Sequence, residues 1–364
     1  MTSLLFWTCA ISVVTAISCA ICGVYLVAKQ EALISEGLGH AVLPGITVGF
    51  IIFRERNSPW LLIFAALTGI IMVLIFQFLR RTRLVDVDAS LGIVFSAMFS
   101  GGVILSTQNL RNIHFHPECI IDGNIAEAAL DTLIIGDVNF GPRTLWTMLT
   151  VLSILILFIV ICYKEMNVMT FDESFAQAIR LRPNLFHFIW LGLVSLTTVC
   201  AFETAGSILV VALMIAPPAA GYLLSNSMLQ FFLWSGVIAA ISAVAGVFLG
   251  YELDISPVGP IAFCSGLAFL TAAMLAPKQG LISRLTNRSN HRYLLFKKLF
   301  LRTLEDGKLN KLSNSNLLWS RREHDLVIRN CLRENLVTES NGDYRITDLG
   351  LKELEINYFS FTTK

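Results

Sequence analysis

The feature that most constrains this chain is a succession of apolar segments, each long enough to cross a lipid bilayer as one helix. A membrane-spanning helix needs about 17–25 largely apolar residues. Eight segments fit this length: residues 4–27, 59–79, 90–108, 143–163, 186–202, 205–224, 228–250 and 257–276. In lipid, every backbone polar group must be satisfied within the protein, and continuous apolar segments achieve this as α-helices. The sequence therefore predicts an all-α polytopic membrane protein.

A further apolar segment, residues 38–53, is shorter and carries polar and helix-breaking residues. It contains His40, Pro44 and Gly45. Pro and Gly are tolerated at membrane depth where protein or a cavity satisfies the backbone groups that they free, and interrupted segments often mark transport sites. We predict a distorted or partial span here, and eight or nine transmembrane helices in total.

Charge divides the chain into two parts. Residues 1–276 hold 11 Lys/Arg and 16 Asp/Glu, whereas the much shorter segment 277–364 holds 16 and 10. In the second part, residues 324–335 have a helical pattern, and Asn341-Gly342 between alternating segments predicts a β-hairpin. A final helix follows. We therefore predict a transmembrane domain in residues 1–276 and a small, basic, winged-helix-like cytoplasmic domain in residues 277–364.

The distribution of Lys and Arg predicts the orientation, because these residues are enriched in cytoplasmic loops. With nine spans and the charged C-terminal domain inside, the inner loops hold seven Lys/Arg and the outer loops four. The first apolar segment has no preceding Lys or Arg and is too long for a cleaved signal peptide, so we expect it to be retained. The N-terminus then lies outside the cytoplasm.

Glu36 and His40 are the first candidates for chemistry. Residues four apart lie on one face of a helix, and a carboxylate beside an imidazole forms half a site for a divalent transition metal. Ionisable groups in a membrane segment are costly and are therefore functional candidates. The alternative is a loop Glu at the surface and a His bonded to a backbone carbonyl.

Several ordered motifs resemble the permease subunits of ATP-binding cassette importers for manganese, iron or zinc. Residues 35–50, SEGLGHAVLPGITVGF, closely resemble the S-D-x-x-S-H-A-V-L-P-G signature of that family. Five further segments resemble other stretches of it: residues 88–105, 114–128, 140–148, 169–179 and 202–224. The resemblance implies a type II importer-like permease fold for the first part of the chain.

The resemblance also implies roles for individual residues. The family's acidic residue and His in the second span face the translocation path and bind or gate the ion, and they fall on Glu36 and His40. Glu replaces the usual Asp, which keeps a hard oxygen ligand, and Gly39 replaces the usual Ser. Helix breaks are expected at two proline-containing positions, Pro44-Gly45 and Pro217-Pro218.

One predicted inner loop resembles the coupling segment that docks onto the ATP-binding subunit. The residues concerned are Phe171, Asp172, Phe175, Ala176 and Ala178. We expect a short helix with Asp172 as its N-cap and Pro183 as its end. Arg180 occupies a position where the family commonly has Gly.

The predicted outer loop, residues 109–142, carries His114, His116 and Glu118, and Glu203 is a further acidic candidate. Direct metal contact and docking of a metal-delivering binding protein are both open for these residues, and Glu203 is alternatively a helix cap. The second half of the loop, residues 126–137, is expected to form a short surface helix.

The expected function is import of manganese, iron or zinc across the bacterial cytoplasmic (inner) membrane by a multi-pass permease with a cytoplasmic C-terminus. The chain lacks the G-x-x-x-x-G-K-[ST] phosphate loop, so we expect no enzyme activity and ATP hydrolysis by a separate subunit. The metal is cargo, and no cofactor is expected to be bound permanently.

The expected partners are a second permease, two ATP-binding subunits, an extracytoplasmic metal-binding protein and membrane lipids. The basic C-terminal domain adds regulation, a packing platform or nucleic-acid binding as open roles. Two alternative functions remain: a gradient-driven secondary transporter, and a membrane-anchored metal-responsive regulator that acts through the winged helix.

Overall fold

The computed structural model describes most of the chain. The described residues are 2–54, 59–82, 84–109, 125–135, 138–171, 173–276, 280, 296–302, 304, 321–340 and 343–356. The chain separates into two compact units, Met1–Pro277 and Lys278–Lys364. Each unit is described by itself.

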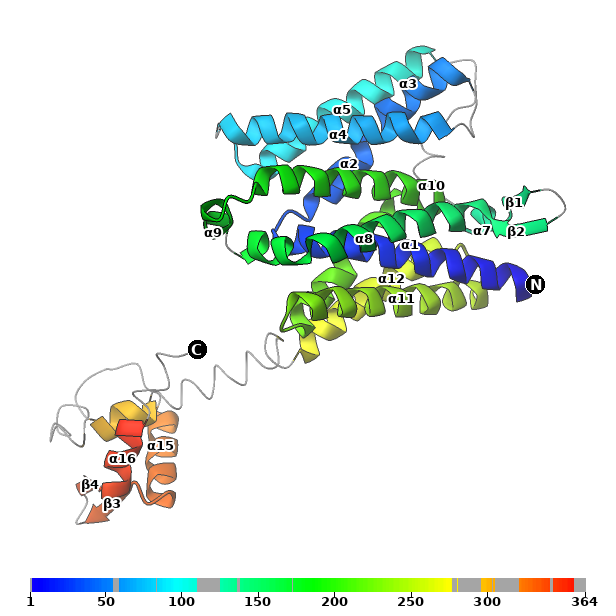
Figure 1. Ribbon diagram of the computed structural model, residues 1–364. Coiled ribbons are helices and arrows are strands. Elements are labelled where there is room, and N and C mark those ends of the chain that lie inside the picture. The colour runs from blue at the N-terminus through cyan, green and yellow to red at the C-terminus, as the bar shows by residue number, and fades with distance from the viewer. Residues whose placement is uncertain are drawn as a thin grey trace. The chain divides into compact units, whose positions relative to one another are not determined.

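The first unit is a bundle of long apolar helices (Figure 1). Its long helices are α1 (Thr2–Ala28), α4 (Pro59–Thr82), α5 (Val87–Asn109), α8 (Arg143–Phe171), α10 (Pro183–Leu224), α11 (Met228–Glu252) and α12 (Val258–Leu275). Its shorter elements are α2 (Leu33–Ala41), α3 (Leu43–Phe53), α7 (Ile125–Ala128), α9 (Glu173–Ala178) and the strands β1 (Thr132–Ile135) and β2 (Val138–Pro142). Eight candidate spans are long and apolar enough to cross a membrane, with α2 and α3 together forming one of them. This confirms the predicted all-α polytopic membrane protein.

Helix α10 is long enough for two crossings. Its apolar part, Leu185–Leu224, has 40 residues, which at about 1.5 Å per residue is twice the thickness of a bilayer core. Gly206 interrupts it with φ 76° and ψ 163°, a conformation that only glycine adopts readily. Pro217 and Pro218 lie further along α10 and are buried. The halves on either side of Gly206 correspond to the two separate spans predicted from the apolar pattern.

The interrupted second span consists of α2 and α3. The helices meet at Val42, and Pro44 lies in the first turn of α3, where its missing N–H is tolerated. Gly45 lets α3 approach α4, because a Cβ at this position would collide with the Thr68 side chain and the Phe64 backbone. The close approach at Gly45 holds α3 against α4, while α2 packs against α5 and α10.

Helices α1 and α10 supply the buried centre of this unit, whereas α8 turns most of its apolar surface outward. The core includes Tyr25, Phe76 and Trp190, whose side chains are almost completely buried. Apolar side chains on the outer surface, such as Val160 and Ile161, suit contact with lipid and need not be covered by other parts of the protein. Apolar residues on both sides of a helix are therefore expected in this unit.

Two local predictions were wrong. Residues 126–137 do not form one surface helix: α7 is a single turn, and β1 then pairs with β2 as an antiparallel hairpin, in keeping with the strand preference of Thr132, Ile134 and Ile135. Pro183 does not end α9 but begins α10, where a proline needs no N–H partner.

Helix α9 ends instead through Arg180. This residue has φ 64°, and the Leu181 N–H donates to the Ala176 carbonyl at 3.0 Å. A left-handed residue after the last turn is the usual way to satisfy terminal helix carbonyls, and glycine is the residue best suited to it. Arg180 therefore occupies a position whose backbone conformation glycine would adopt more readily.

The second unit contains α15 (Arg321–Arg333), β3 (Val337–Ser340), β4 (Asp343–Ile346) and α16 (Asp348–Ile356). Strands β3 and β4 pair antiparallel, with Ser340 opposite Asp343, so that two residues connect them as the hairpin signal predicted. The Thr347 hydroxyl accepts from the Gly350 N–H and caps α16. Burial among apolar neighbours raises the pKa of the Cys331 thiol in this small core. The winged-helix assignment stays a prediction.

Candidate functional site

Glu36 and His40 lie on α2, the first half of the divided span. Glu36 is exposed and His40 is partly buried. The His40 ring stacks on Phe95 at a centroid distance of 5.7 Å and meets Phe99 edge-on at 5.4 Å. Two rings of α5 therefore hold the imidazole in place, while the carboxylate one turn earlier stays accessible.

A small, partly open hollow lies beside His40. Its lining is Gly39, His40, Val42, Leu43, Ile46, Phe99, Phe202 and Ser207. Most of these side chains are apolar, so the imidazole is the strongest ligand that faces the hollow. The residues after the α10 break contribute Ser207 to the same wall.

Steric contact explains why a glycine suits position 39 in this lining. A Cβ at position 39 would approach the Phe202 ring to 2.8 Å, closer than real Cβ atoms come to a neighbour. A larger residue at position 39 therefore requires the Phe202 ring to move.

The pair supplies one carboxylate oxygen donor and one imidazole nitrogen donor. Such a mixed set suits manganese, iron and zinc alike. Among the described residues, no group of three or more His, Cys, Asp or Glu side chains is placed to hold a metal ion. If both side chains bind a metal ion, water or another subunit must complete its coordination, and a weak site is what release during transport requires.

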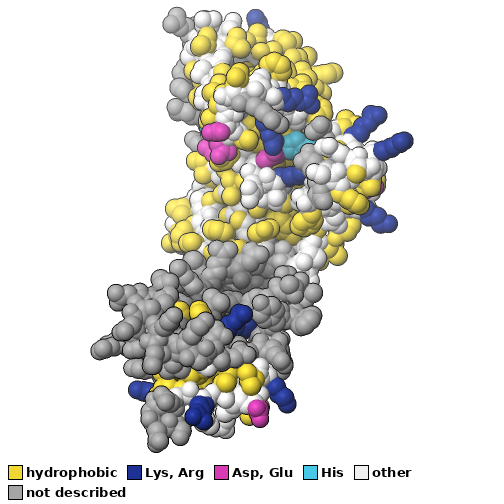
Figure 2. All heavy atoms as spheres, turned by 90° about the vertical axis from the view of Figure 1, so that its left-hand side faces the viewer, with side chains coloured by type: hydrophobic (Ala, Val, Ile, Leu, Met, Phe, Trp, Pro, Cys, Tyr) yellow, Lys and Arg dark blue, Asp and Glu magenta, His cyan; other side chains and the backbone are white. Residues whose placement is uncertain are grey.

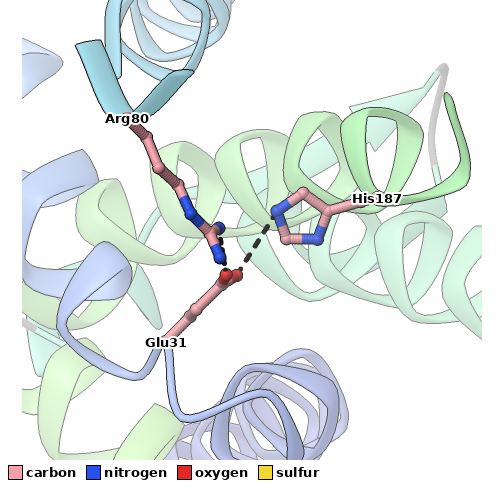
Figure 3. A network of polar contacts seen from close by, with 3 residues as sticks. All are labelled: Glu31, Arg80 and His187. Carbon is pink, nitrogen blue, oxygen red and sulfur yellow. Dashed lines mark hydrogen bonds and ion pairs between the residues drawn. The ribbon is translucent and has the colours of Figure 1, made fainter. Parts of the chain in front are cut away.

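A second polar cluster was not found from the sequence. Glu31, in the connection between α1 and α2, accepts from Arg80 Nη1 at 2.6 Å, and His187 Nε2 lies 3.3 Å from its other oxygen (Figure 3). The Glu31 side chain is 6% exposed. Its partners come from the end of α4 and the start of α10, which are remote in sequence. No local spacing marks such a cluster, although a Glu and an Arg at neighbouring span ends were available as a signal.

The coupling segment exposes large apolar side chains. Phe171 is 79% exposed and Phe175 is 54% exposed, whereas Ala176 is fully buried and Ala178 is exposed. Asp172 lies outside the described residues. Phe171 is the last residue of α8 and Phe175 lies on α9, so two exposed aromatic rings from consecutive helices form an apolar surface that suits contact with another protein.

This segment lies at one end of the first unit, here called the α9 end, together with the last turns of α4 and α12 (Figure 1). Figure 2 shows Lys and Arg side chains on this face among hydrophobic ones. The exposed basic residues of the α9 end are Arg80, Arg81, Lys164, Arg180 and Arg182. Among the described residues, the opposite end has only Arg54 and Arg143 exposed.

The remaining candidates are not brought into one site. His114, His116 and Glu118 lie outside the described residues. Glu203 is exposed on α10, three residues before the break at Gly206. The structure therefore brings His40 together with residues of α5 and α10, keeps Glu36 exposed one turn earlier on α2, and leaves the outer-loop residues as a prediction.

The fold and the divided span define a multi-pass membrane protein with an ionisable residue, His40, beside a hollow, a combination typical of permeases. The profile of the ABC 3 transport family matches residues 1–276. The chain belongs to this family.

Named relatives agree with the family. The chain is 34% identical to the manganese transport system membrane protein MntD of Bacillus subtilis over 278 residues, 76% of this chain and 94% of that one. It is 31% identical to the zinc transport system membrane protein TroD of Treponema pallidum over 357 residues, 94% of this chain and 95% of that one. The latter match therefore extends through the second unit.

A solved structure has the same fold. PsaBC from Streptococcus pneumoniae, in complex with Fab, aligns with a TM-score of 0.63 and 26% identity over 75% of this chain and 91% of that chain. The share covered corresponds to the first unit alone. The likeness confirms the predicted permease fold for that unit.

Proposed function

We propose that the chain is the permease subunit of an ATP-binding cassette importer that carries manganese, zinc or iron. The observation that carries this proposal is the Glu36–His40 pair on a divided span of an ABC 3 family member. Relatives named as manganese and zinc transport membrane proteins support the cargo class. The chain itself is a transport subunit, and a partner subunit hydrolyses ATP.

The α9 end faces the cytoplasm in this proposal. Its exposed basic residues follow the enrichment of Lys and Arg in cytoplasmic loops. Phe171 and Phe175 then dock onto the ATP-binding subunit, and the opposite end receives metal from a binding protein. A second permease, the same or a sister chain, completes the assembly. The membrane is the bacterial inner membrane, and the second unit lies in the cytoplasm.

Transport follows from the geometry of the pair. His40 lines the hollow and Glu36 lies exposed one turn earlier on the same helix, so the two side chains offer an ion one imidazole nitrogen and one carboxylate oxygen. Movement of α10 relative to α2 changes the wall that Phe202 and Ser207 contribute. The ion is thereby offered to one side and then to the other.

The test is uptake by the His40→Ala variant. We expect uptake of radioactive manganese, zinc and iron to fall about 100-fold or more, because even the loss of an outer-shell partner of a metal ligand costs about 10–100-fold. The assay uses the permease with its partner subunits in membranes and equal amounts of inserted protein. The matched control is Ser100→Ala on α5, an exposed residue that does not line the hollow. Wild-type uptake of all three metals by His40→Ala would refute the assignment.

A further inference from the structure

We propose that Glu31, Arg80 and His187 form an ionic latch that transmits movement of the coupling segment to the metal-bearing helix α2. The proposal rests on the transport function proposed above. These residues are positioning residues and do not bind the cargo. The cluster lies at the α9 end, where three segments far apart in the sequence meet on one carboxylate (Figure 3).

The backbone holds Glu31 firmly between two helices. Its N–H donates to the Leu26 carbonyl at 2.8 Å, after Gln30 with φ 59°, which closes the end of α1. Its own carbonyl accepts from the Ile34 N–H at 3.0 Å in the first turn of α2. Because Glu31 belongs to both helix ends, α2 cannot tilt relative to α1 without moving this carboxylate.

The two partners connect Glu31 to the moving parts. His187 lies in the second turn of α10, which begins at Pro183 a few residues after the coupling helix α9. Arg80 lies in the last turn of α4. Helix α4 contacts α3 at Gly45 and α10 at Gly69. Near Gly69, the Ser195 hydroxyl donates to the Ala66 carbonyl at 3.4 Å. A push on α9 therefore reaches α2 through His187 and Glu31, and α3 through α4.

The surroundings make the cluster sensitive to small displacements. Glu31 is almost completely buried, and an aromatic group lies on one side: Tyr25 is 6.2 Å from the His187 ring and 5.4 Å from the Trp190 ring. A buried carboxylate has lost its water and depends on its partners, here the Arg80 guanidinium at 2.6 Å with the His187 ring beside it. When α10 moves, Glu31 must keep one partner, exchange it or be hydrated. Each of these three states of the carboxylate corresponds to a different position of α2. The cluster therefore acts as a latch that holds α2 in one position until α10 moves.

A double-mutant cycle tests the latch without any metal. The assembled transporter carries Glu31→Gln, Arg80→Gln or both, and its thermal midpoint is measured without nucleotide and with a non-hydrolysable ATP analogue. We expect the two substitutions to be non-additive without nucleotide, because each removes the same interaction. We expect them to become additive with the analogue, because the docked ATPase has pulled α10 away. Equal non-additivity in both states would mean a merely structural ion pair and would overturn the latch.

Transport supplies the second readout. We expect Glu31→Gln and Arg80→Gln each to lower the metal imported per ATP hydrolysed by about tenfold, within the range of typical allosteric couplings. The exchanged pair Glu31→Arg with Arg80→Glu should recover part of this ratio. The controls are Glu252→Gln and Arg81→Gln, both exposed residues outside the cluster. Recovery no better than in the single variants, at equal protein levels, would contradict the proposal.

The two proposals fail in different ways. If the wild type imports none of the three metals while the thermal cycle still depends on nucleotide, the proposed cargo is wrong and the latch stands. If the wild type imports metal but the cycle is the same in both nucleotide states, the latch is wrong and the proposed function stands.

Discussion

The two polar sites of the first unit are built in opposite ways, although Glu31 and Glu36 are only five residues apart. Glu36 is exposed and, among the described residues, takes part in no ion pair, and its neighbour His40 is held by aromatic rings beside a hollow. Glu31 is buried and lies between Arg80 and His187.

This difference separates a site that can exchange its ligand from one that holds helices together. A carboxylate with a guanidinium at hydrogen-bond distance has little to offer a divalent cation, since the cation must displace a fixed positive charge. A carboxylate with open coordination space can bind and release. The same residue type is accessible at one position and joins helices at the other.

Neutralising each carboxylate gives the sharpest contrast. We expect Glu36→Gln to lower metal uptake by about 100-fold, as for loss of a metal ligand, with almost no change in stability because the side chain is exposed. We expect Glu31→Gln to destabilise the protein by about 1–2 kcal/mol, at the lower end for a buried charged partner because Arg80 is half exposed and water can replace the lost oxygen. Uptake assays and thermal unfolding of both variants check this. Equal stability loss at both positions would remove the distinction.

Backbone contact at Gly45 offers the next largest effect. Gly45→Ala places a methyl group against Thr68 and the Phe64 carbonyl, and we expect a cost of about 1–3 kcal/mol from overpacking. The α2 site should suffer more than the Glu31 cluster, because α3 would be pushed off α4 directly after the helix break. The matched control is Gly92→Ala on α5, where a Cβ has open space. If the unfolding temperature of Gly45→Ala is no lower than that of Gly92→Ala, α3 can move away from α4 freely and the overpacking argument is wrong.

A smaller and opposite effect is expected at Arg180. Arg180→Gly relieves a left-handed residue at the end of α9, so we expect a gain of about 0.5–1 kcal/mol, reduced by the extra freedom of glycine in the unfolded chain. Gln177→Gly, in the helix itself, should instead lose about 1 kcal/mol. Thermal unfolding of the two variants decides the sign. The more stable end of α9 should hold α9 more firmly relative to the Glu31 cluster. It should leave the α2 site unchanged.

The sequence predicts these two sites to very different degrees. Span positions follow from apolar length, and Glu36 with His40 follows from helical spacing and a motif, since both are local signals. The Glu31 cluster depends on α4 and α10 coming together, which no local signal records. Gly206 is hidden for a similar reason: an apolar stretch of 40 residues does not show which of its glycines adopts positive φ. The end of α9 was misplaced because Arg180 does not resemble the glycine that usually occupies such a position.

The smallest effect on transport is expected from deletion of residues 277–364. Among the described residues, both polar sites consist of first-unit residues alone. The manganese transport protein of Bacillus subtilis matches over 278 residues that make up 94% of its own length, which leaves no room there for such a unit. We therefore expect a truncated chain to import metal within about twofold of the full chain, too small a change in free energy to involve a ligand or a buried ion pair.

A loss as large as that of Glu36→Gln, with normal insertion, would show that the second unit completes one of the sites. If uptake by the truncated chain no longer falls when the cell is metal-replete while that of the full chain does, the second unit regulates a transport machine that is complete without it.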